Sequence, residues 1–129
     1  MNRKKRQMKS VYTLAIAAFI LFATACENKP AFEPALFEGA WKCSVLYTDG
    51  VENLNPQTII FDFKLDSTYN YTGGSYTETG KWWLEGDKLV TAAEGDLEKK
   101  VQIEKINADT LVMNMNDRGT DMKLILLPQ

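Results

Sequence analysis

The sequence contains no histidine and only two cysteines in 129 residues. Histidine is the commonest acid–base catalyst at neutral pH and the commonest metal ligand. Its absence excludes catalytic arrangements of the Ser/His/Asp and Cys/His types. A glycine-rich phosphate loop is also missing, because Gly73-Gly74 lies between two expected strands with no helix to follow.

Carboxylates are plentiful, but their placement does not suggest catalysis. Asp62 and Asp66 alternate outward on an expected strand and its turn, and Glu85 and Asp87 flank a glycine turn. A glycoside-cleaving pair would have to face one cleft, and no stretch has the spacing of an EF-hand calcium loop. We therefore expect a protein that is not an enzyme and that has no metal and no cofactor.

The N-terminus has the pattern of an export signal. Five basic residues within positions 3–9 precede an apolar run over residues 11–25. That run is shorter than the roughly 20 apolar residues of an ordinary transmembrane helix, which disfavours an uncleaved membrane anchor. A basic head followed by a short apolar run is typical of a secretory signal peptide, so residues 1–25 are predicted to be removed.

The residues at the end of this run indicate how the chain is processed. Ala23-Thr24-Ala25 precedes Cys26, and this order resembles a bacterial lipobox, in which the cysteine receives a diacylglycerol. Alanine at position 23 departs from the usual leucine, and the same small residues also suit a general signal peptidase. Lipid attachment at Cys26 is the favoured interpretation, and an unlipidated secreted protein is the alternative. In that alternative, a Cys26–Cys43 disulfide could form in an oxidising compartment.

Removal of residues 1–25 makes the chain acidic. The full sequence has 15 basic and 17 acidic residues. Five of the basic residues are lost, so 10 remain against 17 acidic ones and the net charge is −7. An acidic surface repels nucleic-acid phosphates, so no nucleic-acid partner is expected. Membrane attachment would come from the N-terminal lipid, which holds stably when two or more acyl chains are present.

The remaining 104 residues divide into a tether and one domain. Residues 26–35 carry Pro30 and Pro34, which interrupt regular structure, and are predicted to form a lipidated tether. From residue 36 to 129 apolar and polar residues alternate with a period of two, as in strands with one buried face. Turn residues separate eight expected strands, at 37–48, 57–65, 68–73, 75–84, 88–93, 98–106, 110–116 and 120–127.

Short links between consecutive strands predict an all-β antiparallel up-and-down meander. A meander of about eight strands can close into a small barrel and so remove its edges. The charged stretch at 98–106 also suits a short helix, and a single turn is expected near residues 32–36. The first strand breaks the alternation once, because Leu46 falls among its polar positions.

Four motifs in order carry a family resemblance. They are L-F-E-G-A-W at 36–41, F-D-F-K-L-D-S-T-Y at 61–69, G-K-W-W-L at 80–84 and G-D-K-L at 86–89. This order resembles the small lipocalin-like lipoproteins of Bacteroidota, over roughly residues 36–127. The resemblance implies a lipocalin-like barrel in which Trp41 packs across the closed end. It also implies a binding domain of the cell envelope, and Glu27 with the tether after it favours an outer-membrane location facing the periplasm.

Two functions remain open at this point. The first is binding of a small apolar ligand by inward-facing residues, for which the candidates are Trp41, Tyr47, Phe61, Phe63 and Met113. It requires a cavity of about 300 Å³ or more. The second is a structural or protein-interaction lipoprotein with a filled barrel. It requires an exposed aromatic patch near Tyr69, Tyr71 and one of Trp82 or Trp83, which must point to opposite faces of their strand.

Overall fold

The computed structural model describes residues 29–129 and contains one antiparallel sheet. The predicted signal peptide, Cys26 and the first residues of the tether lie outside the described residues. A short 3₁₀ helix, η2 (Pro34–Phe37), precedes the sheet. The strands are β1 (Gly39–Thr48), β2 (Val51–Glu52), β3 (Ile59–Phe63), β4 (Thr68–Gly73), β5 (Tyr76–Glu85), β6 (Lys88–Ala93), β7 (Lys99–Ile106), β8 (Leu111–Asp117) and β9 (Thr120–Pro128).

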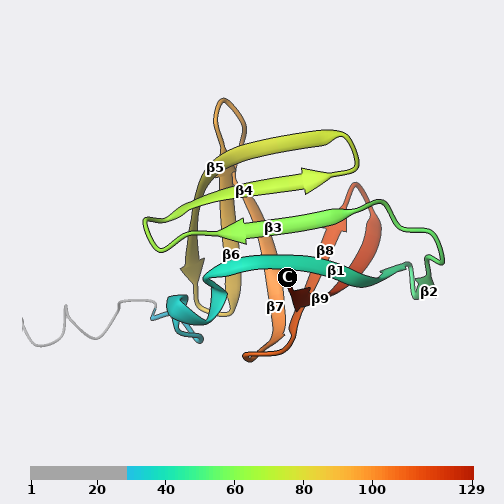
Figure 1. Ribbon diagram of the computed structural model, residues 1–129, viewed down its shortest axis with the longest axis horizontal. Coiled ribbons are helices and arrows are strands. Elements are labelled where there is room, and N and C mark those ends of the chain that lie inside the picture. Colours follow the sequence, from blue (N-terminus) through green and yellow to red (C-terminus); the bar gives the residue numbers. More distant parts are fainter. Residues whose placement is uncertain (1–28) are drawn as a thin grey trace, which may run out of the picture.

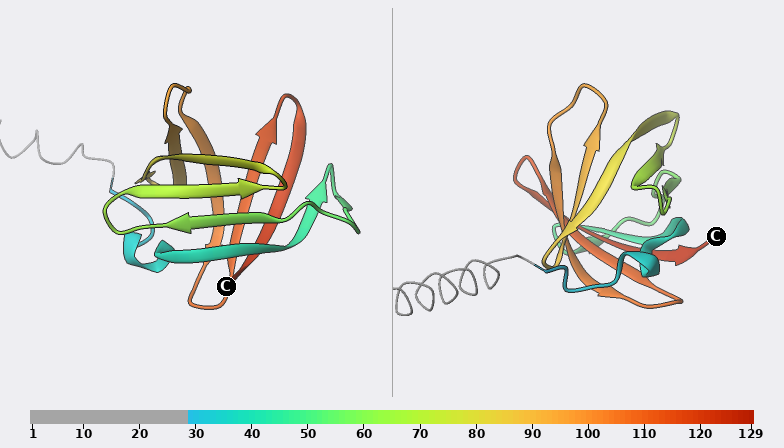
Figure 2. Two further views of the ribbon diagram at one scale, coloured as in Figure 1. Left: turned by 45° about the horizontal axis from the view of Figure 1, so that its top comes forward. Right: turned by 90° about the vertical axis from the view of Figure 1, so that its left-hand side faces the viewer.

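The sheet closes on itself, as predicted. Each strand from β3 to β8 pairs with the next one along the chain, and β1 pairs with both β3 and β9. The β1–β9 pairing runs from Trp41 opposite Pro128 to Thr48 opposite Met122. Figures 1 and 2 show β3–β5 crossing β6–β9 at a steep angle, with β1 and β9 completing the wall. The result is an eight-stranded barrel with β2 as an additional edge strand.

The eight expected strands are confirmed, with differences at β2 and at Phe37. The stretch at 98–106 is strand β7, so the helical alternative is wrong there. The two-residue strand β2 lies in the loop between β1 and β3, where none was expected. Phe37 was expected to begin the first strand, but it ends η2 and is fully buried. Within the described residues no helix is long and apolar enough to cross a membrane.

A β-bulge changes which side chains of β1 face the interior. Cys43 lies opposite Leu126 but Val45 lies opposite Ile125, so one extra residue is inserted on β1. After the bulge Leu46 joins the core and lies opposite Leu124. Because neighbouring side chains alternate between the faces, Tyr47 then lies on the outer face opposite Lys123. The expectation that Tyr47 points inward is therefore wrong, and the bulge accounts for the irregular Leu46.

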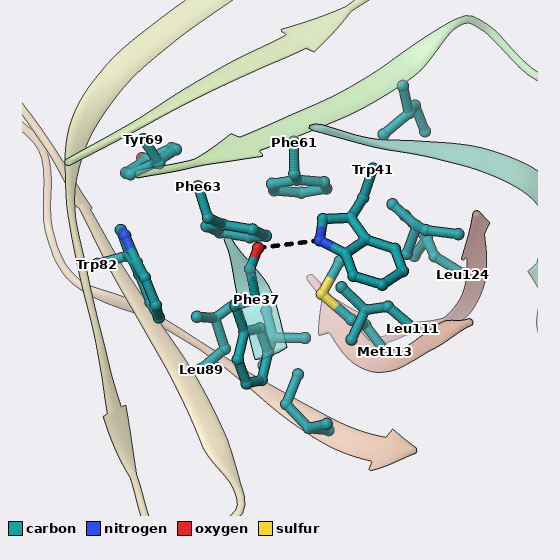
Figure 3. Packing of buried hydrophobic residues seen from close by; sticks show 14 of the residues in the cluster. Phe37, Trp41, Phe61, Phe63, Tyr69, Trp82, Leu89, Leu111, Met113 and Leu124 are labelled. Atoms are coloured by element: carbon teal, nitrogen blue, oxygen red, sulfur yellow. Dashed lines mark hydrogen bonds between the residues drawn. The ribbon is translucent and has the colours of Figure 1, made fainter. Parts of the chain in front are cut away.

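One end of the barrel is filled. Phe37 lies beneath the strands there, with its ring 5.8 Å from that of Trp82 and 6.1 Å from that of Phe63. The Trp41 indole N–H donates a 2.9 Å hydrogen bond to the Phe37 carbonyl oxygen (Figure 3). Burial of these large apolar groups is the main source of stability in a domain of this size. The packed end confirms the position that the family resemblance implied for Trp41.

A glycine allows the chain to pack closely at the middle of β5. A Cβ atom at Gly80 would collide with the carbonyl oxygen of Ala92 and lie 2.7 Å from the Cα of Ala93 on β6. On β4, the side of the sheet opposite to β6, Tyr69 lies across from Gly80 and is only 2% exposed. The missing side chain therefore permits the tight β5–β6 approach and leaves Tyr69 unobstructed at this point of the wall.

Candidate functional site

The other end of the barrel holds a cavity of about 410 Å³, which we call the cup. An up-and-down topology places the β1–β3, β4–β5, β6–β7 and β8–β9 connections around this end, while η2 lies at the filled end (Figure 2). Six of the residues that line the cup are apolar or aromatic, and six are polar or charged. Its lining consists of Phe61, Tyr71, Glu78, Leu89, Thr91, Lys99, Lys100, Val101, Met115, Asn116, Asp117 and Met122.

An aromatic wall forms one side of the cup. The ring of Phe61 lies 4.9 Å from that of Tyr71, which in turn lies 6.3 Å from that of Tyr76. Tyr76 is 56% exposed at the tip of the β4–β5 hairpin. Gly73 has no side chain, and this leaves space for the Tyr71 hydroxyl, which reaches toward that tip. The wall therefore runs from the buried core at Phe61 outward to the solvent at Tyr76.

A carboxylate lies beside this wall. Glu78 is directly opposite Tyr71 in the β4–β5 register, and its Oε2 accepts a 3.1 Å hydrogen bond from the Tyr69 hydroxyl. Its Oε1 is covered and has no hydrogen-bond partner within the described part of the chain. A buried polar atom without a partner is unusual and unfavourable. Glu78 thus carries the one covered side-chain oxygen or nitrogen without a hydrogen-bond partner among the described residues.

The surroundings of Glu78 affect both tyrosines. Burial, together with the negative charge of Glu78 and the hydrogen bond to it, raises the pKa of Tyr69 to about 12, and Thr91 acts weakly in the opposite direction. Burial is also the main cause of the raised pKa of Tyr71, with the charge of Glu78 second. Both phenols therefore stay protonated well above neutral pH, and the Tyr69 hydroxyl remains a donor to Glu78.

Three other charged side chains line the cup. Lys100 forms a 2.9 Å ion pair with Glu85, which raises the pKa of Lys100 and lowers that of Glu85. Lys99 and Asp117 are exposed, and neither forms an ion pair within residues 29–129. Glu85 neutralises the charge of Lys100. The remaining charged residues of the lining are Glu78, Asp117 and Lys99, and together they give the cup a net charge of about −1.

A larger, more open groove of about 730 Å³ lies on the outer face of β7–β9. It includes Tyr47, Lys123 and Ile125, and Lys123 forms a 3.0 Å ion pair with Glu104. The pairing of β7 with β8 stops at Gln102 opposite Asn114, before the strands reach the mouth. The groove and the cup meet at this gap, where they share Lys100, Met115, Asn116 and Met122.

The five candidate binding residues do not lie together. Trp41, Phe63 and Met113 are at most 3% exposed and belong to the packed core, which Figure 3 shows around Phe37. Phe61 lies at the boundary between this core and the cup. Tyr47 lies in the outer groove. Sequence reasoning did not select Glu78, Tyr71, Met115 or Met122 as binding residues. Glu78 and Trp82 are an even number of residues apart on β5 and therefore lie on the same face of the strand. This spacing was the available signal that Glu78 points inward.

The remaining cysteine is half-buried. Burial raises the pKa of the Cys43 thiol, whose Sγ–H donates a 3.3 Å hydrogen bond to the carbonyl oxygen of Val45. It has no disulfide partner among the described residues, and its predicted alternative partner Cys26 lies outside them. No cluster of three or more potential metal ligands occurs between residues 29 and 129.

Comparison with known proteins identifies the family. Residues 37–113 match the lipocalin-like domain family, and the chain belongs to it. The fold is also similar to that of a lipocalin-like protein from Bacteroides uniformis ATCC 8492, known from a crystal structure. That match has a TM-score of 0.56 and 16% sequence identity, and it covers 73% of this chain and 99% of the other. No curated protein is similar enough in sequence to be matched with this chain.

Proposed function

We propose that this protein is a lipid-anchored lipoprotein of the cell envelope that binds a small, largely apolar ligand in the cup and catalyses no reaction. The family supports a lipocalin-type binding fold. Lipid on Cys26 would attach the chain to a membrane, and an outer-membrane position facing the periplasm fits the sequence around that cysteine. The ligand would contact Phe61, Val101, Met115 and Met122 rather than the deeper residues of the filled end.

The cup itself is the observation on which this proposal depends. Its volume of about 410 Å³ lies within the range of about 300–1,000 Å³ that is typical of small-molecule sites. Such sites combine apolar walls with polar groups that orient the ligand, and half of the twelve residues that line the cup are apolar or aromatic. A site of this kind gains affinity from apolar burial and gains orientation from its polar groups.

The alternative function, a structural or protein-interaction lipoprotein with a filled barrel, receives less support. It requires an exposed aromatic patch near Tyr69 and Tyr71. Tyr69 and Trp82 are buried, and Tyr71 is half-buried and packs against the core. Trp83 is the partly exposed member of the tryptophan pair, but it lies on the outer face, away from both tyrosines. We therefore favour small-molecule binding.

Obstruction of the cup is expected to abolish binding of a neutral apolar dye such as Nile red. Met122→Trp places a larger side chain in the cup, and we expect the dye affinity to fall by about tenfold or more, which corresponds to about 1.4 kcal/mol. The matched control is Ile125→Trp, which adds the same indole on the opposite face of β9. Dye fluorescence titrated with each variant measures the dissociation constants.

Equal losses in the two variants, or dye binding that Met122→Trp leaves unchanged, would contradict a site in the cup. Binding lost only in Ile125→Trp would instead assign the dye to the outer groove. Far-ultraviolet circular dichroism of both variants checks that the barrel is intact.

The lipid anchor is tested by expressing the full chain in a bacterium that processes lipoproteins. We expect the mature protein to begin at Cys26 and its intact mass to include a diacylglycerol. Cys26→Ser is expected to move most of the protein from the membrane fraction to the soluble fraction, because the acyl chains supply the attachment. Cys43→Ser is the control and should remain with the membrane. A mature chain that begins at an unmodified Cys26, linked to Cys43, would contradict the proposal.

A further inference from the structure

We infer that the cup selects ligands with a cationic amine, and that the Glu78 carboxylate binds this amine beside the aromatic wall of Phe61, Tyr71 and Tyr76. The inference rests on the proposed function, since it names the chemical class of the ligand that enters the cup. It is carried by the arrangement of the covered carboxylate oxygen, the aromatic rings and the charges at the mouth.

The first argument is the incomplete hydrogen bonding of Glu78. Oε2 accepts the Tyr69 hydroxyl, whereas Oε1 is covered and has no partner among the described residues. A carboxylate in this position has lost part of its hydration without full compensation, which is unfavourable. Oε1 is closed to solvent in this conformation, so a ligand reaches it only when the Glu78 side chain rotates toward the cup, and a hydrogen bond donated to Oε1 then removes this deficit. A charged N–H donor gives a shorter and stronger bond to a carboxylate than a neutral donor does.

The second argument is the position of the aromatic wall. Tyr71 faces Glu78 across the β4–β5 register, and its ring lies between those of Phe61 and Tyr76. An ammonium group bound at Oε1 would therefore have aromatic faces near it. Cations are attracted to such faces by the ring quadrupole, and the attraction is strongest where water is excluded. The same rings provide apolar contact for the carbon chain of an amine.

The third argument is the balance of charges that face the cup. Among residues 29–129 no lysine or arginine forms an ion pair with Glu78, although Lys99 lines the same cavity from β7. Lys100 is held by Glu85, and Asp117 on β8 adds a second negative charge at the mouth. The protein's own cations thus leave the carboxylate unpaired. A cationic ligand enters a cup with net negative charge, and an anionic one is opposed by it.

The test uses three probes of equal chain length, namely octylamine, 1-octanol and octanoate, titrated into the mature domain by calorimetry at neutral pH below their aggregation limits. We expect octylamine to bind most tightly and octanoate most weakly. Glu78→Gln keeps the size and shape of the side chain and removes its charge. We expect this variant to bind octylamine about tenfold more weakly or worse, because a charge-assisted hydrogen bond is lost.

Asp109→Asn is the matched control, because it removes one negative charge from the exposed β7–β8 turn at the filled end, outside the cup. We expect it to change octylamine affinity by less than about threefold, since exposed charges are screened by salt. Affinity for 1-octanol should change by less than about twofold in either variant, because neither alters the apolar walls. Thermal unfolding is expected to show that Glu78→Gln is at least as stable as the unsubstituted protein.

The outcomes separate this inference from the proposed function. If octanoate binds as tightly as octylamine, or if Glu78→Gln leaves octylamine binding unchanged while 1-octanol still binds, the amine selectivity is wrong and the cup remains a binding site. If Asp109→Asn weakens octylamine binding as much as Glu78→Gln does, general attraction by the acidic surface replaces a specific contact. If neither the three probes nor Nile red binds, the proposed function fails as well.

Discussion

Replacement of Trp82 with alanine is expected to lower the free energy of unfolding by about 3–5 kcal/mol, as is usual for removal of a large buried aromatic residue. The same change at the adjacent Trp83 is expected to lower it by about 1 kcal/mol or less, the usual contribution of a cross-strand pair. The two variants lose identical atoms one position apart, so the difference between them measures which face of β5 is buried. Urea unfolding followed by circular dichroism provides both values.

The expected difference follows from the surroundings of the two indoles. Trp82 is 4% exposed, its ring lies 5.3 Å from that of Phe63 and 5.8 Å from that of Phe37, and its N–H donates to the Lys64 carbonyl oxygen at 2.9 Å. Its removal leaves a cavity at the filled end and takes away one of the two hydrogen bonds that the Lys64 carbonyl oxygen accepts, the other coming from the Ser67 N–H. Trp83 lies opposite Val90 and donates only to the exposed Glu85. Similar effects of the two substitutions would mean that the filled end does not stabilise the domain.

Lys123→Pro is expected to lower the free energy of unfolding by about 3 kcal/mol or more, because a proline in a strand with two neighbours removes a ladder hydrogen bond. Lys123→Ala is expected to lower it by about 1 kcal/mol or less, since this substitution breaks only the exposed ion pair with Glu104. The same urea experiment compares them. The difference between the two variants reports on closure of the barrel between β1 and β9.

The position of Lys123 makes this test specific. The Asp49 N–H donates to the Asp121 carbonyl oxygen at 2.7 Å, so the backbone polar groups of Asp121 point toward β1. These groups alternate along an antiparallel strand, and Lys123, opposite Tyr47, also points toward β1. In an open sheet that ended at β9 this N–H would face solvent and proline would be tolerated. Equal stabilities of the proline and alanine variants would therefore contradict a closed barrel.

Much of the fold could be predicted because one face of each strand is buried. Alternation with a period of two, together with turns rich in glycine and aspartate, identified every strand of the barrel and the closure of the sheet. The short strand β2 was not predicted, because its two residues, Val51 and Glu52, are both exposed and show no such alternation. Phe37 was placed one element too late, because an aromatic residue next to a strand looks the same whether it extends the strand or lies beneath the barrel.

The candidate site was harder to predict than the fold. The alternation of Trp41, Cys43, Val45 and Tyr47 appeared continuous, but the bulge reverses the faces after Cys43. A bulge adds one residue without changing the composition, and only the misplaced Leu46 gave a sign of it. The depth of each side chain was also hidden, since periodicity distinguishes inside from outside but not the filled end from the open one. Trp41, Phe63 and Met113 were thus correctly predicted to face the interior, but they lie in the packed core and do not line the cup.

Glu78 illustrates a different limit. A glutamate between two threonines resembles a solvent-facing position, and hydrophobic patterning treats every polar residue as outward. Its inward direction follows from its parity with Trp82, and the hydrogen bond to its Oε2 comes from Tyr69 on the neighbouring strand β4. Both facts depend on neighbouring strands. Polar residues inside a barrel can therefore be recognised only after the register between strands is known.

The chain enters the barrel beside the plugged end, where the Ala31 N–H donates to the Gly86 carbonyl oxygen in the β5–β6 turn. The β4–β5 and β8–β9 hairpins, which surround the mouth of the cup, lie on the other side of the molecule from η2 (Figure 1). A domain anchored to a bilayer through this N-terminal segment, as we propose, would have the mouth of the cup facing away from the bilayer and toward the aqueous compartment. A ligand could then enter or leave the cup while the protein stays attached to its membrane, and the length of the tether would set the distance of the domain from the bilayer.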